Sequence, residues 1–171
     1  MEESTAHADL QHRVWALRAS IERYLQLQQD QIASIRVAPP RDGYTPSQQK
    51  LNSEADVHIE ALLNNARHLS RALQSKHLPA SIKGQSLGGL DSPIRHVRNI
   101  REHWDENRVF WSEGTTPPKG SSARWFKTNF PDKTPWSSSW SNAEGPVICG
   151  IIRLNELLLV LDQLDGLIDK T

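Results

Sequence analysis

Near the start of the chain, apolar residues recur every three or four positions. Because a helix turns once in about 3.6 residues, this spacing places them on one face and predicts an amphipathic helix over about residues 6 to 33. Pro39 and Pro40 end the pattern, since proline has no backbone N–H to donate within a helix. The residues expected to face the core are Leu10, Val14, Leu17, Ile21, Tyr24, Leu25 and Ile32.

A second helix is predicted to begin after Thr45. Thr45 and Gln48 have the spacing of a capping box, and Pro46 occupies the preferred first helical position. The following stretch, residues 79–90, contains three glycines and is therefore predicted to be a connection rather than a helix. The expected core residues of the second helix are Ile59, Leu62, Leu63, Ala66, Leu69 and Leu73.

The third predicted helix starts with Ser92 as N-cap and Pro93 at the first helical position, and it extends to about Trp111. A rotation of about 100° per residue separates it into two faces. The apolar face is expected to contain Val97, Ile100, Trp104 and Trp111. The polar face is expected to contain Arg95, Asn99, Glu102, His103 and Glu106, with Arg98 at its edge.

Residues 112–145 form a long insert rich in Trp, Pro and Ser. Long inserts without structure are uncommon in compact domains, so we expect its aromatic residues to attach it to the bundle, with a short hairpin around residues 124 to 126. After Pro146 the chain is apolar on most sides, which predicts a final, deeply buried helix that also offers a seam for a dimer. The aromatic residues of the insert are Trp125, Phe126, Phe130, Trp136 and Trp140.

Together these elements predict an all-α fold over residues 1–171. We expect a single domain, because 171 residues suffice for one core and not for two. Its architecture is predicted to be a four-to-five-helix up-and-down bundle, with the insert at about 112–145 lying before the last helix.

The charge and cysteine content narrow the classes of function. Twenty basic and twenty acidic residues cancel, so any RNA binding would come from a local patch rather than from the overall field. A single cysteine, Cys149, allows neither an internal disulfide nor a cysteine-based zinc site, and a small buried side chain in a cytoplasmic protein is expected. The most apolar stretch is interrupted by Arg153, Asn155 and Glu156, so no membrane span is expected.

The candidate site is the sequence Arg98-Asn99-x-x-x-His103 on the third helix, with Arg95 and Glu102 beside it. Glycine loops for phosphate, zinc-binding helices, nucleophile elbows and acidic calcium loops are not found in the sequence, so no metal or cofactor is expected. Arg98 is followed directly by the polar Asn99, and four residues separate Arg98 from His103. This motif resembles the Arg-to-His motif of the HEPN domains. The resemblance extends to a late helix in an all-helical chain of suitable size.

Resemblance to the HEPN domains implies a protein of a bacterial defence or toxin type. The catalytic members of this family cut RNA without metal at a cleft between two subunits of a dimer. By this resemblance Arg98 would hold the scissile phosphate, His103 would act as general acid or base, and Asn99 would orient the site. Arg95 and Glu102 would be auxiliary. The chemistry is reasonable because RNA supplies its own nucleophile, the 2′-hydroxyl, and an imidazole titrates near neutral pH.

Other interpretations remain open. The polar face could be an ordinary solvated surface with i,i+4 pairs joining Arg98 to Glu102 and Arg101 to Asp105. A non-catalytic module is the main alternative, in which the bundle binds a partner protein through the insert. A third, a nucleotide-binding helper of a nucleotidyltransferase, rests on family analogy. The residues expected at the partner surface are Trp125, Trp136 and Trp140.

Overall fold

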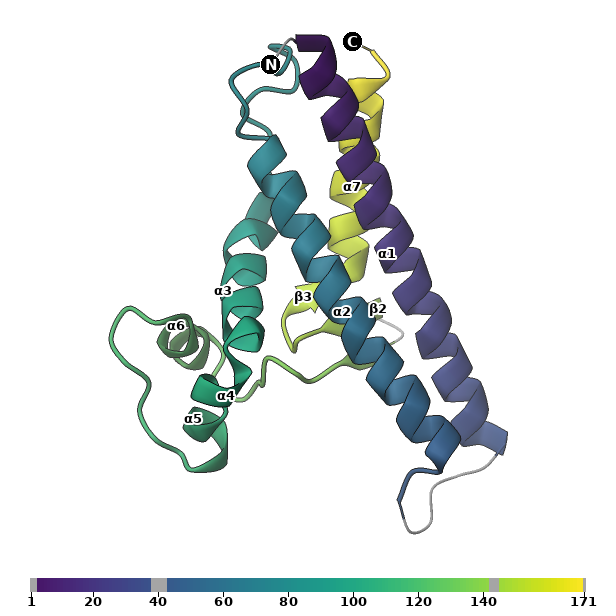
Figure 1. Ribbon diagram of the computed structural model, residues 1–171, viewed down its shortest axis with the longest axis vertical. Helices are drawn as coiled ribbons and strands as arrows, with labels where there is room; N and C mark the ends of the chain where they lie inside the picture. The colour runs from purple at the N-terminus through teal and green to yellow at the C-terminus, as the bar shows by residue number, and fades with distance from the viewer. Residues whose placement is uncertain (1–2, 38–42, 142–144, 171) are drawn as a thin grey trace.

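The computed structural model describes residues 3–37, 43–141 and 145–170. In this part of the chain the long helices run alternately up and down, and the all-α prediction is confirmed (Figure 1). The first two helices form an antiparallel pair; the last helix lies along the first, and the third helix lies along the second. These helices are α1 (Glu3–Val37), α2 (Pro46–Ala72), α3 (Asp91–Glu102) and α7 (Leu154–Ile168).

Shorter elements connect the long helices. The sheet is antiparallel in the order β1-β2-β3, and Val147 of its central strand is the partner of both Ser139 and Arg153. The strands are β1 (Ser139–Ser141), β2 (Gly145–Ile148) and β3 (Ile152–Arg153). The short helices are η1 (Gly88–Leu90), α4 (Trp104–Asn107), α5 (Val109–Ser112) and α6 (Ser122–Asn129).

The start of α2 follows the prediction closely. The Thr45 hydroxyl accepts a hydrogen bond from the Gln48 N–H at 3.3 Å, and the Gln48 side chain accepts one from the Thr45 N–H at 3.0 Å. Pro46 is the first helical residue. These contacts satisfy backbone donors that the first turn of a helix leaves unpaired, so the sequence alone determines where α2 begins.

The core lies where α1, α2, α3 and α7 meet. All six core residues predicted on α2 are buried, and so are the first five predicted on α1. Leu25 is only partly buried, and Ile32 is 37% exposed because the far ends of α1 and α2 extend beyond α3 and α7 (Figure 1). Leu27, which is not among the predicted core residues, is buried instead.

The prediction for the third helix is wrong at both ends. Helix α3 begins at Asp91, not after Ser92, because the Asp91 carboxylate accepts hydrogen bonds from the Leu87 N–H and the Ser70 hydroxyl and fixes the entry of the chain. It ends at Glu102 instead of near Trp111. The backbone of His103, with φ of −110° and ψ of 43°, is not helical and separates α3 from α4, and the Asn107 amide donates to the His103 carbonyl oxygen at 2.9 Å.

The insert packs on the bundle, as predicted, but by a different local structure. No hairpin forms around residues 124 to 126; these residues lie in α6, whose first turn is capped by the Ser121 hydroxyl accepting from the Arg124 N–H. Phe126 of α6 is fully buried against the core. The surrounding sequence predicts little helix. Helix α6 forms there because Ser121 caps its first turn and Phe126 packs into the core.

The last helix also begins later than predicted. Residues after Pro146 form β2 and β3, which a turn with positive φ at Cys149 and Gly150 connects, and α7 starts only at Leu154. A Cβ atom at Gly150 would approach the Thr134 carbonyl oxygen to 2.9 Å, so glycine is needed there. One face of α7 is buried, whereas Leu159 on the other is 62% exposed.

Candidate functional site

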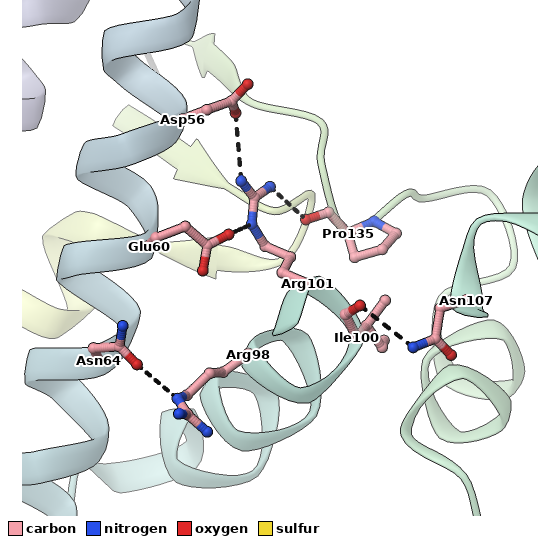
Figure 2. A network of polar contacts seen from close by, with 8 residues as sticks. All are labelled: Asp56, Glu60, Asn64, Arg98, Ile100, Arg101, Asn107 and Pro135. Atoms are coloured by element: carbon pink, nitrogen blue, oxygen red, sulfur yellow. Dashed lines mark hydrogen bonds and ion pairs between the residues drawn. The ribbon is translucent and has the colours of Figure 1, made fainter. Parts of the chain in front are cut away.

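Arg98 points from α3 towards α2 (Figure 2). Its Nε donates to the Asn64 side-chain oxygen at 2.7 Å, and its Nη1 forms an ion pair with a Glu102 carboxylate oxygen at 2.8 Å. The predicted i,i+4 pair between Arg98 and Glu102 is therefore confirmed. The Arg98 side chain retains 21% of its accessible surface, so its guanidinium is held in place and still reaches solvent.

Asn99 points in a different direction, towards α6. Its amide donates to the Ser122 hydroxyl at 3.4 Å, and the same hydroxyl lies 3.1 Å from His96 Nδ1. The His96 ring stacks on Trp125 with centroids 4.2 Å apart. Burial, with the nearby Arg95 cation adding to its effect, lowers the pKa of His96. Asn99 and His96 thus hold α6 against α3.

His103 lies just beyond the last turn of α3. Its backbone N–H still donates to the Asn99 carbonyl oxygen at 3.3 Å, but its φ and ψ of −110° and 43° are no longer helical. The side chain is 57% exposed, and its Nδ1 is 3.9 Å from a Glu106 carboxylate oxygen. In the described part of the chain no hydrogen bond or ion pair joins His103 to Arg98; their side chains have different partners, Asn64 and Glu102 for Arg98 and Glu106 for His103.

The predicted pair between Arg101 and Asp105 is wrong. Arg101 instead extends to α2, where its guanidinium pairs with Glu60 at 2.5 Å and with Asp56 at 3.4 Å (Figure 2). It also donates to the Pro135 carbonyl oxygen at 3.4 Å, and its side chain is only 9% exposed. The packing of α3 on α2 places the two carboxylates in its reach, and Arg101 fastens both α2 and the insert to α3.

A stripe of polar residues on α2 could have indicated these contacts. Successive members are three or four residues apart, so they share one face of the helix, and their character changes from acidic to basic along it. The arginines of α3 also recur at intervals of three. The α2 stripe is Asp56, Glu60, Asn64, Arg67 and Arg71, and the α3 arginines are Arg95, Arg98 and Arg101.

Cys149, in the turn between β2 and β3, is fully buried, as expected. Burial raises the pKa of its thiol to about 12, so the reactive thiolate is scarce at neutral pH. Among the residues that the structure describes, no cluster of His, Cys, Asp and Glu side chains could hold a metal ion. No helix in this part of the chain is both long and apolar enough to cross a membrane.

The geometry thus separates the three predicted site residues: Arg98 contacts α2, Asn99 contacts α6, and His103 faces solvent. Arg95 lies one turn before Arg98, and its guanidinium contacts the His96 ring at 3.4 Å. Comparisons with models of protein families, with curated proteins and with solved structures found no match to this chain.

Proposed function

We propose that this chain is a HEPN-like endoribonuclease of a bacterial defence or toxin type, which cleaves RNA in the cytoplasm without a metal ion. In this proposal Arg98 binds the scissile phosphate, His103 transfers a proton and Asn99 supports the site. The observation that carries the proposal is the arrangement at the end of α3, where a fixed guanidinium precedes an accessible imidazole by little more than one turn.

The two side chains have complementary properties for this reaction. Arg98 is held by Asn64 and Glu102 before any substrate arrives, which reduces the entropy lost when it binds a phosphate. His103 has no carboxylate within hydrogen-bonding distance in the described structure, since Glu106 is 3.9 Å away. Its imidazole is therefore free to accept or donate a proton at a substrate oxygen.

The reaction needs two proton transfers. One group takes the proton of the 2′-hydroxyl as its oxygen attacks phosphorus, and another donates a proton to the 5′-oxygen as the P–O bond breaks. The products are a 2′,3′-cyclic phosphate and a 5′-hydroxyl. A single imidazole cannot supply both transfers in one step, so we propose a homodimer that contributes two copies of His103 and Arg98 to one cleft.

Glu102 acts against substrate binding in this scheme. Its carboxylate occupies the Arg98 guanidinium at 2.8 Å, so a phosphate must displace it or share the guanidinium. We therefore expect Glu102→Gln to bind RNA more tightly than the unchanged protein, since the neutral amide competes less with phosphate.

The test is an RNA cleavage assay with EDTA present, in which product ends are mapped. We expect cleavage by the unchanged protein that leaves 2′,3′-cyclic phosphate, and loss of that cleavage in His103→Ala and in Arg98→Ala. His12→Ala is the matched control, because His12 is an exposed histidine of α1. Cleavage at the normal rate by His103→Ala would exclude the proposal, as would an inactive unchanged protein in its dimeric form.

A second candidate function is binding of a partner protein. A groove of about 580 Å³ is lined in part by Trp104, Trp111 and Trp136, and Trp104 is 42% exposed. Aromatic residues that remain partly exposed are typical of interfaces. Trp125 is less suited to this role because His96 and Phe130 cover it, and the Trp140 side chain lies outside the described residues. A purified partner that binds the unchanged protein and not Trp104→Ala would support this function.

A further inference from the structure

A cavity between α2 and α3 takes no part in the RNA cleavage proposed above. Its volume is about 720 Å³, which lies in the usual range for sites that bind small molecules. It is formed by the last turns of α2, the connection around Gly84 and the first turn of α3. Four of its lining side chains are cations: Arg67, Arg71, Lys83 and Arg95.

These cations lack acidic partners within the described residues. No ion pair or hydrogen bond engages the side chains of Arg67, Arg71 or Lys83 there, and Arg95 contacts only the His96 ring. By contrast, the arginines farther along α3 are paired, since Arg98 binds Glu102 and Arg101 binds Glu60. The cationic side chains of the cavity are therefore available to an anion.

Asp91 supplies the one carboxylate that lines the cavity among the described residues, and this carboxylate is already engaged. One of its oxygens accepts from the Ser70 hydroxyl at 2.5 Å, and the other accepts from the Leu87 N–H at 2.9 Å. Buried Ile82 and Leu87 anchor the same connection in the core. The wall is thus held in place by these contacts, and the cavity is formed before any ligand binds.

The concentration of positive charge has a cost in the empty protein. Burial lowers the pKa of Arg67, and the neighbouring cations Arg71, Arg98 and Arg95 lower it further, whereas the Glu102 carboxylate partly offsets them. An anion bound in the cavity would offset the repulsion between these cations. Ser75, Ser86 and Ser92 also line the cavity and could donate hydroxyl hydrogen bonds to phosphate oxygens.

We propose that this cavity binds a small ligand through an oligophosphate group, with Arg67 and Arg71 of α2, Lys83 and Arg95 around the anion. An oligophosphate fits because several cations from three segments line one open pocket, whereas a single phosphate would not engage them all. The proposal does not depend on RNA cleavage, because none of Arg98, Asn99 and His103 lines the cavity; of the residues named at the cleavage site, the cavity shares the auxiliary Arg95.

The test is calorimetric titration at low ionic strength with inorganic tripolyphosphate, with adenosine triphosphate and with orthophosphate. We expect one tripolyphosphate per chain, weak orthophosphate binding, and affinity at least about tenfold lower in Arg71→Gln and in Arg67→Gln. Tighter binding of adenosine triphosphate than of tripolyphosphate would assign the ligand as a nucleotide, and equal binding would assign it to the phosphate chain alone.

Arg23→Gln is the matched control, since it removes the same charge from an exposed position on α1 outside the cavity. No binding by the unchanged protein would overturn the proposal, as would equal losses in Arg23→Gln and Arg71→Gln. Binding of single-stranded RNA but not of tripolyphosphate would overturn it too. Arg71 is exposed, so its variant should fold even if Arg67→Gln does not. His103→Ala should bind tripolyphosphate normally whether or not the chain cleaves RNA.

Discussion

The two halves of the α2–α3 interface differ in how their charges are matched. In the half that contains Arg101, the guanidinium faces Glu60 and Asp56 on α2. In the half that contains Arg95, the facing α2 residues are Arg67 and Arg71. Arg98 lies between the halves and binds the uncharged Asn64 (Figure 2). The same helix pair therefore changes from matched to unmatched charges along its length.

We expect the matched half to stabilise the fold and the unmatched half to contribute little to its stability. A guanidinium that is 9% exposed, with two carboxylates and a carbonyl oxygen around it, joins two helices and the insert. Like charges gathered around a cavity weaken the empty protein instead. Sequences usually avoid such conflicts except where a function requires them, so the unmatched half is the better place to look for a ligand.

The largest expected effect is the loss of Arg101. Arg101→Met removes the charge from the matched half and leaves the Glu60 carboxylate without its short partner. We expect the free energy of unfolding, measured by urea denaturation, to fall by about 2 kcal/mol.

Arg18→Ala is the control for this prediction, because Arg18 also pairs with two carboxylates of another helix, Asp162 and Asp165, but at the surface. It should cost less than about 1 kcal/mol. Equal losses in the two variants would mean that the matched half is no more important than a surface ion pair.

A smaller effect, of opposite sign, is expected in the unmatched half. Arg67→Gln removes repulsion from Arg71, Arg98 and Arg95 together with the smaller attraction of Glu102, so stability without ligand should stay the same or rise by about 0.5 kcal/mol. Added sodium chloride should stabilise the unchanged protein more than the variant, because salt screens the repulsion that the variant lacks. A loss of more than about 1 kcal/mol in urea denaturation would show that Arg67 is a structural residue.

The smallest effect concerns the pH dependence of His96, next to the unmatched half. Its pKa is lower in the folded protein than its ordinary value of 6.5, so between these two values the unfolded chain binds more protons. His96 therefore contributes stability that is present above about pH 6.5 and is lost as the pH falls towards the lowered pKa. In His96→Gln the unfolding free energy should decline less steeply over this pH window than in the unchanged protein. Equal slopes in the two proteins would show that His96 does not cause the pH dependence.

The sequence predicted the α1–α2 region much better than residues 103–153. The Thr45 capping box and the apolar stripe of α2 are local signals, and local geometry decides their outcome. The segment after α3 is held instead by edge-to-face contact between Trp104 and the distant Trp136, with centroids 4.5 Å apart. Contacts between distant segments leave no periodic trace in the sequence.

At the candidate site, too, the sequence predicted the local contacts and not those between distant segments. The pair Arg98–Glu102 follows from i,i+4 spacing and was predicted. The partners of Arg101 were not, because Glu60 and Asp56 come within its reach only when α3 packs on α2. The roles of Arg98, Asn99 and His103 in RNA cleavage stay a prediction, and the directions in which these side chains point make a second subunit part of it.

The division of the α2–α3 interface can be measured directly from the arginine Nε–Hε resonances in an NMR titration with tripolyphosphate. We predict that the resonances of Arg67, Arg71 and Arg95 shift together and saturate, whereas that of Arg101 stays in place. Shifts at Arg101 as large as those at Arg71, or no shift at any of the cavity arginines, would contradict it.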